Sequence, residues 1–233
     1  MIVTDVEVNK NIRKVADLAK NLNIDRHHST FSSINVTSEL KKLCKASFYY
    51  QEIYDYIAAN NQYNLMLMDN SFFQFSESRN SNNEQELRYA YYPNPYQFIE
   101  FREHVQAVQE LLDQGEISSS EYEQLLNECN FTHHIPVIRY DYSPSQYDAS
   151  FHPASHFHIG FNSENRWPVS KVLTPYLFFI KILSMYYSDI WIENFTNSSE
   201  QTLNDIYSEA KSNSYAVPSN YLSNEDKKRL LIT

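Results

Sequence analysis

Apolar residues recur at helical spacing through the first quarter of the chain. Between Asp5 and Leu22 they lie three or four residues apart, which predicts an amphipathic helix. The polar residues 23–36 predict a loop. Ser38 is a suitable N-cap for a second, long helix whose apolar stripe includes Phe48 and reaches about Asn60. We therefore expect residues 1–60 to form the helical part of the fold.

The pattern then changes to the short, aromatic-rich runs that are typical of strands. Residues 63–68 and 71–75 flank Asp69-Asn70, a pair that tolerates the positive φ of a tight turn, and so predict a hairpin. Residues 87–92 predict a third strand, after an exposed loop over 77–86.

A helical hairpin is expected next. Asn94 followed by Pro95 is typical of a helix start, and Gly115 is expected to end that helix in a left-handed conformation. Ser118 and Glu121 have the spacing of a capping box, which predicts another helix to about residue 130.

Strand patterns return at 137–142 and 156–162, and three helices are expected after them. Residues 176–187, opened by Thr174-Pro175, are apolar nearly all round and predict a buried central helix. Residues 198–201 predict the cap of a helix that runs to about Lys211, and 224–229 predict a short solvated helix or a frayed end. About five strands without a βαβ alternation favour an α+β fold with a mostly antiparallel sheet and helices packed on it. We expect residues 1–233 to form one domain, in which 61–233 carry the sheet.

Composition narrows the class of protein. No apolar run is long enough to cross a bilayer, and the first residues, Met-Ile-Val-Thr-Asp-Val-Glu, lack the pattern of a signal peptide, so we expect a cytoplasmic protein without membrane contact. The isolated Cys44 and Cys129 do not suggest a disulfide framework or a zinc ribbon. A formal net charge of −10 argues against nonspecific coating of nucleic acid, although it permits a local basic cleft.

Three of the eight histidines and one of the two glycines fall within residues 151–160. Because side chains alternate along a strand, His156 and His158 are expected on one face, and Arg139 and Asp141 on one face of the preceding strand. If the two strands are antiparallel neighbours, the four groups meet and project into solvent together. His152, held by Pro153, can lean in from the loop.

Three readings fit this cluster. In the first, the two imidazoles act as general base and acid on a phosphodiester, Arg139 binds the phosphate, Asp141 orients one ring, His152 assists, and no cofactor is needed. In the second, His156, His158, Asp141 and His152 hold a transition metal. In the third, the histidines bind a partner or form a buried hydrogen-bonded network, which is the commoner role of a single histidine in a core.

The flanking residues allow two roles each. Arg166 can add a guanidinium at the rim of the site or simply close a turn, and Tyr140 and Tyr142 are candidate substrate-binding residues. Gly160 fits a bulge or a close strand contact. The aromatic residues of strands 71–75 and 87–92 fit a core better than a base-stacking surface.

Two resemblances accompany this pattern. The order Arg-Tyr-Asp-Tyr, His-Pro-Ala-Ser-His-Phe-His-Ile-Gly, Arg-Trp-Pro and Thr-Pro-Tyr resembles an uncharacterised bacterial family known as a domain of unknown function. Its specific part covers 139–187, and it implies a site without an activity. The Arg-x-Asp and His-x-His elements alone are faintly similar to small toxins of toxin–antitoxin modules.

We therefore expect a bacterial protein that processes RNA or a nucleotide in a toxin or phage-defence setting. The alternative from another class is a non-catalytic subunit that binds and regulates a protein encoded nearby. A metal-dependent hydrolase is the third reading.

Overall fold

The computed structural model of the protein describes residues 4–128, 136–161, 164–196 and 201–230. The chain divides into two compact units, one formed by 1–93 with 136–233 and the other by 94–135. The N-terminal helical residues 1–60 therefore belong to the same unit as the sheet.

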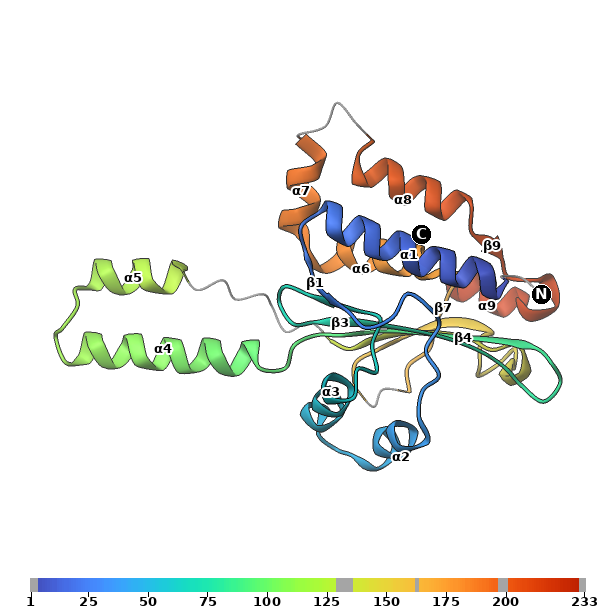
Figure 1. Ribbon diagram of the computed structural model, residues 1–233, viewed down its shortest axis with the longest axis horizontal. Helices are drawn as coiled ribbons and strands as arrows, with labels where there is room; N and C mark the ends of the chain where they lie inside the picture. Colours follow the sequence, from blue (N-terminus) through green and yellow to red (C-terminus); the bar gives the residue numbers. More distant parts are fainter. Residues whose placement is uncertain (1–3, 129–135, 162–163, 197–200, 231–233) are drawn as a thin grey trace. The chain divides into compact units, whose positions relative to one another are not determined.

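An antiparallel sheet of seven strands, counted over the described residues, organises the larger unit. Its spatial order follows the chain, so each strand pairs only with its neighbours in sequence (Figure 1). The strands are β1 (Asp25–His28), β2 (Leu65–Leu67), β3 (Phe72–Arg79), β4 (Gln85–Tyr92), β5 (Ile138–Tyr142), β6 (Ser155–Ile159) and β7 (Trp167–Pro168). The prediction of an α+β fold with an antiparallel sheet is confirmed.

The sheet has two more strands than the sequence predicts, both at its edges. β1 lies in the segment expected to be a loop, and β7 lies in the segment read as a possible turn. Half of the loop expected over 77–86 is strand, because β3 extends to Arg79 and β4 begins at Gln85. A separate pair is formed by β8 (Lys171–Val172) and β9 (Tyr215–Ala216).

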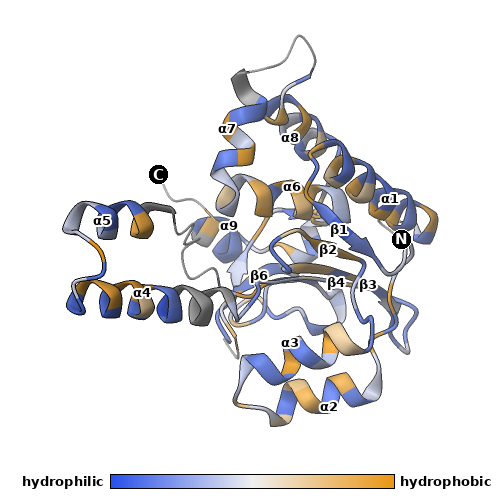
Figure 2. Cartoon of the chain, turned by 60° about the vertical axis from the view of Figure 1, so that its left-hand side comes forward, coloured by the Kyte–Doolittle hydropathy of each residue, from blue (hydrophilic) through white to orange (hydrophobic). Residues whose placement is uncertain are grey.

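Four helices lie on one face of the sheet: α1 (Asp5–Asn21), α6 (Pro175–Tyr186), α7 (Ser188–Thr196) and α8 (Leu203–Ser212) (Figure 1). The side chain of Thr174 caps α6, as its sequence predicts. Phe178 and Phe179 are fully buried, and both rings contact Phe73 of β3. Figure 2 shows α6 mainly in orange and α1 in both orange and blue, which fits a buried helix beside an amphipathic one. The main core therefore lies between α6 and this face.

The other face is covered by α2 (Ser38–Ala46) and α3 (Tyr50–Ala59), which replace the single long helix that was expected (Figure 1). Ser47 is extended and ends α2; its hydroxyl donates to the Glu52 carboxylate at 2.6 Å and accepts from the Tyr49 backbone N–H at 3.0 Å. The break turns Phe48 out of the apolar stripe. The N-cap of α2 is Thr37 rather than Ser38.

The smaller unit contains α4 (Gln97–Asp113) and α5 (Ser119–Glu128). Gly115 has φ +75° directly after the C-cap of α4, and Ser118 and Glu121 form the expected capping box. The start of α4 differs from the prediction, since Tyr96 is its N-cap and Asn94 accepts a hydrogen bond from the Tyr96 backbone N–H.

The remaining differences concern the last third of the chain. The cap expected at 198–201 falls mainly outside the described residues, and α8 is instead capped by Thr202. α7 was not expected, whereas α9 (Asn224–Leu230) matches the predicted short helix. Across the described ranges, no helix combines the length and the apolar character that a membrane span requires. Cys129 lies outside those ranges.

Candidate functional site

The register of β5 and β6 brings the candidate residues into two cross-strand rows. Asp141 is directly opposite His156, and Arg139 is directly opposite His158, so all four lie on the face covered by α2 and α3. The predicted sharing of one face is therefore confirmed. On the other side of β5, Arg88 of β4 is opposite Asp141 and adds a second guanidinium to the row.

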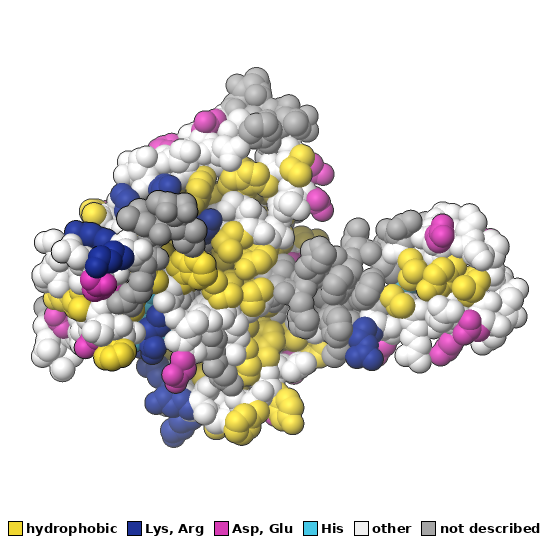
Figure 3. Space-filling view, turned by 180° about the vertical axis from the view of Figure 1, so that it is seen from behind, with side chains coloured by type: hydrophobic (Ala, Val, Ile, Leu, Met, Phe, Trp, Pro, Cys, Tyr) yellow, Lys and Arg dark blue, Asp and Glu magenta, His cyan; other side chains and the backbone are white. Residues whose placement is uncertain are grey.

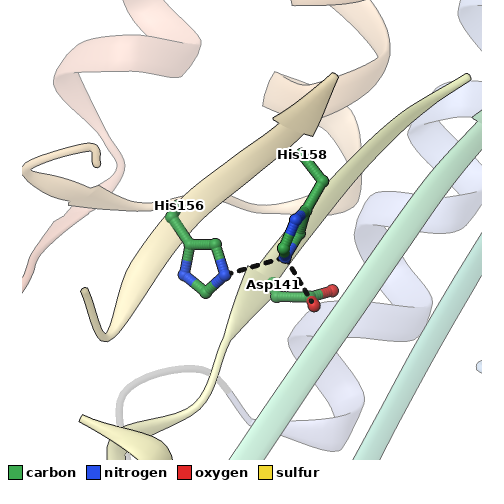
Figure 4. A group of neighbouring side chains, drawn as sticks. All are labelled: Asp141, His156 and His158. Carbon is green, nitrogen blue, oxygen red and sulfur yellow. Dashed lines mark hydrogen bonds and ion pairs between the residues drawn. The ribbon is translucent and has the colours of Figure 1, made fainter. Parts of the chain in front are cut away.

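The side chains of Asp141, His156 and His158 point toward one another (Figure 4). Nε2 of His156 lies 3.0 Å from Nε2 of His158, which in turn lies 3.5 Å from Oδ2 of Asp141. Each residue offers a metal-ligating atom, and these atoms all lie within 4.8 Å of one another. Among the described residues, no other group of three or more His, Cys, Asp or Glu converges in this way.

The expectation that both imidazoles project into solvent is wrong. His156 is 0% exposed and His158 is 6% exposed, whereas the Asp141 side chain keeps 21% of its surface. Neighbouring elements provide the cover. α2 brings Cys44 close to Arg139, and the ring of His152 packs against that of His156 with the centroids 4.9 Å apart. The carboxylate is thus the most accessible member of the cluster.

The hydrogen bonds determine the tautomers of the two rings. The Pro153 carbonyl can only accept, so Nδ1 of His156 donates to it at 2.7 Å. A neutral His156 then has its lone pair on Nε2, and the proton between the two rings belongs to Nε2 of His158. Both nitrogens of His156 are therefore hydrogen-bonded without a positive charge on that ring.

The electrostatics of the cluster shift the pKa values of His156 and Asp141. Burial, and then the neighbouring His158 ring, lower the pKa of His156 to about 4. For Asp141, burial opposes ionisation, but the hydrogen bond with His158 and the charges of Arg139 and Arg88 outweigh it and lower the pKa. At neutral pH the cluster therefore combines a neutral His156 with an ionised Asp141.

His152 and Arg166 lie at the border of the cluster. Burial and the charge of Arg166 lower the pKa of His152. Nδ1 of His152 and Nε of Arg166 are both buried without a hydrogen-bond partner among the described residues. His152 is not one of the three converging ligands, so it is placed beside the cluster rather than in it.

The two tyrosines expected to bind substrate lie on the opposite face. Tyr140 and Tyr142 are fully buried in the core, because alternation points them away from Arg139 and Asp141. The Tyr140 hydroxyl lies 2.9 Å from Ser155 Oγ and accepts a hydrogen bond from the Leu173 backbone N–H at 3.0 Å. We assign both residues a packing role.

Arg88 is the residue of the site that sequence reasoning missed. Its position in a strand is visible in the sequence, but which strand lies beside it depends on pairing across about fifty residues. Neither Arg88 nor Arg139 forms a hydrogen bond or an ion pair within the described part of the chain. Both guanidinium groups are therefore available to an anionic ligand.

Comparison with protein families gives one match, which covers residues 15–227, to the family described as an uncharacterized conserved protein (DUF2290). The chain belongs to this family. The matched segment contains the strands that carry the site and the helices that cover them. Comparisons with curated proteins and with solved structures find no match. The resemblance to an uncharacterised family is thus borne out, and a likeness to toxins gains no support.

Proposed function

We propose that this family member is a metal-dependent phosphodiesterase that acts on RNA or a nucleotide. One observation carries the proposal: two buried imidazole nitrogens and a carboxylate converge on one point beside two guanidinium groups that lack ion pairs. Two histidines and one carboxylate are a common ligand set for divalent transition metals such as iron, zinc and manganese.

The distances fit a shared ion. Metal–nitrogen bonds of about 2.0–2.1 Å at angles between octahedral and tetrahedral separate two nitrogens by about 2.9–3.4 Å. The two Nε2 atoms are 3.0 Å apart. The bond from His156 Nδ1 to the Pro153 carbonyl is the outer contact that fixes a metal-binding histidine with its Nε2 lone pair facing inward. Metal binding requires His158 to move its proton to Nδ1.

The unpaired arginines favour a phosphate substrate. Guanidinium groups match the geometry of phosphate oxygens and can bind two of them at once. Arg88 and Arg139 flank Asp141 from two strands, so a bound phosphate would contact the exposed side of the cluster. The unpartnered Nδ1 of His152 and Nε of Arg166 are buried at the border of the cluster and could bond a ligand that enters it.

In the proposed reaction, a water oxygen forms a bond to phosphorus, the bond from phosphorus to the leaving oxygen breaks, and that oxygen takes up a proton. A bound transition metal would lower the pKa of the attacking water. Arg88 and Arg139 would neutralise the charge that builds up on the phosphate oxygens. The buried His156 would hold the ligand geometry and stay away from the substrate.

The metal-free mechanism fits the geometry less well. A general acid and base must each reach the reacting groups, and one of them must be protonated. Here Nε2 of His156 faces His158, and its pKa of about 4 keeps it neutral at physiological pH. Retained cleavage by metal-free protein would restore this mechanism.

Elemental analysis of the protein, purified without a histidine tag or chelator, tests the metal. We expect about one transition-metal ion per chain, lost in both His158→Ala and Asp141→Asn. His104→Ala is the matched control, because His104 is exposed on α4 in the smaller unit. Metal-free wild type that gains no stability from added zinc, manganese or iron would reject the metal site.

Cleavage of RNA and of methyl 4-nitrophenyl phosphate tests the reaction. We expect hydrolysis that a chelator abolishes and added metal restores, with at least a hundredfold loss in Asp141→Asn. Arg139→Lys tests the phosphate contact, because lysine keeps the charge and loses the bidentate geometry. A metal-loaded protein without activity on either substrate would refute the proposal.

The cellular setting and the partner are part of the same proposal. We propose that the activity serves a toxin or phage-defence role with a protein partner encoded nearby. Toxicity on expression that His158→Ala removes, and co-purification of a neighbouring gene product, would support it. A harmless chain that purifies alone would count against it.

A further inference from the structure

The corner between α2 and α3 presents two adjacent aromatic side chains to solvent. Phe48 is 88% exposed and Tyr49 is 66% exposed. The backbone beneath them is tied by the Ser47 hydroxyl to the Tyr49 N–H and the Glu52 carboxylate, so the exposure belongs to the folded corner. Neighbouring exposed aromatics of this kind are typical of binding surfaces.

This corner lies beside the candidate site. Cys44, four residues before Phe48, is close enough to Arg139 for the guanidinium to counter the rise that burial causes in the thiol pKa. The Tyr50 hydroxyl donates to the Pro93 carbonyl at 2.5 Å, and the Tyr50 ring packs at 5.7 Å on Phe161, three residues after His158. The aromatic pair is thus anchored next to the β5–β6 rows.

The same helix carries positive charge. Lys41, Lys42 and Lys45 are all exposed on α2, whose only acidic residue is Glu39. In Figure 3, dark-blue side chains extend down one side of the molecule and reach its lower edge next to yellow hydrophobic ones. Together with Arg139, the lysines place four bases at this corner against three acids, Glu39, Glu52 and Asp55, whereas the whole chain has a net charge of −10.

We infer that the α2–α3 corner binds single-stranded nucleic acid, with bases stacked on Phe48 and Tyr49 and phosphates held by the α2 lysines. Every base has a face that can stack on an aromatic ring, and only an unpaired strand exposes those faces. The inference rests on the proposed function, because it extends the substrate from one phosphodiester to a strand that passes over Arg139. A protein partner would not require the combination of lysines and stacking rings.

Fluorescence anisotropy of a labelled 12-nucleotide oligouridine RNA tests the inference, with metal-stripped protein to prevent cleavage. We expect the double variant Phe48→Ala with Tyr49→Ala to weaken binding at least tenfold. The triple Lys41→Ala, Lys42→Ala, Lys45→Ala variant should weaken binding and reduce its salt dependence by about two in log–log slope.

Matched controls come from another part of the surface. Phe31 is exposed near β1, and Lys10 and Lys20 are exposed on α1, on the opposite face of the sheet. Their alanine variants should bind RNA as the wild type does. Equal binding by the aromatic double variant and the wild type would overturn the inference, as would a preference for duplex over single strand.

The two proposals can fail separately. If the wild type cleaves methyl 4-nitrophenyl phosphate but does not bind the oligonucleotide, the inference fails and the proposed reaction stands. If it binds RNA through the corner but cleaves neither substrate with metal present, the inference stands and the proposed reaction fails.

Discussion

The low pKa of His156 predicts that the metal-free protein loses stability as the pH falls from 7 to 4. The unfolded chain binds a proton at this ring with a pKa near 6.5, whereas burial lowers the folded value to about 4. Between these values the unfolded state binds more protons, so the free energy of unfolding decreases with decreasing pH. This difference between the folded and unfolded pKa values lowers the free energy of unfolding, relative to neutral pH, by about 2 kcal/mol at pH 5 and about 3 kcal/mol at pH 4.

Urea denaturation of chelator-treated protein between pH 7.5 and 4.5, followed by circular dichroism, measures this loss. His156→Asn is the informative variant, since an asparagine amide can still donate to the Pro153 carbonyl but does not titrate. The variant should show a flatter pH dependence than the wild type, whatever its stability at pH 7.5. His152, whose pKa is also lowered, remains in both proteins; because its ring packs against that of His156, the same titration of His152→Asn measures its share of the pH dependence.

The reasoning is refuted if wild type and His156→Asn lose stability in parallel over this range. It is also refuted if the wild type becomes more stable on acidification, because that requires a His156 that prefers its charged form. Excess metal should move the acid-induced loss of stability to lower pH in the wild type but not in His156→Asn, since metal and protons compete for Nε2 of His156.

Three further predictions concern the fold. Phe178→Ala should destabilise the protein by about 3–5 kcal/mol, because it removes a fully buried ring from the main core, whereas exposed Ile192→Ala should cost under about 0.5 kcal/mol in the same urea titration. Tyr187→Phe should cost about 1–3 kcal/mol in urea denaturation, because the hydroxyl lies within 2.8 Å of oxygens of Asp69, Ser71 and Tyr91; a smaller loss would mean that these groups find other partners. Thr174→Ala should lower stability by about 1 kcal/mol through loss of the α6 N-cap, and Thr174→Ser should restore most of it.

The sequence was sufficient to predict elements whose pattern spans several turns or whose start is marked by two matching residues. α1 and α6 each show several turns of helical spacing, and the capping box at Ser118 has two matching residues. The side-chain alternation that brings Asp141 and His156 to one face needs only a period of two. These features are local, so the sequence displays them.

Short or non-local features were missed for physical reasons. β1 and β7 have four and two residues, too few for a period to emerge, and they gain their hydrogen bonds from strands already in the sheet. The break at Ser47 depends on a side chain that competes with the helix for backbone hydrogen bonds, which helical spacing alone does not reveal.

Burial of the histidines could not be inferred from β6 itself, and it changes which chemistry fits. Alternation assigns His156 to a face, but it does not show that the His152 ring packs on the His156 ring or that the Pro153 carbonyl accepts from its Nδ1. A group that exchanges protons with a substrate must contact that substrate. A metal ligand must contact only the metal, which would itself contact the substrate. The 21% exposure of the Asp141 side chain marks the open side of the cluster, which is also the side flanked by Arg88 and Arg139. If His156 and His158 were exposed, the cluster would favour acid–base catalysis; because they are buried, it favours a metal centre.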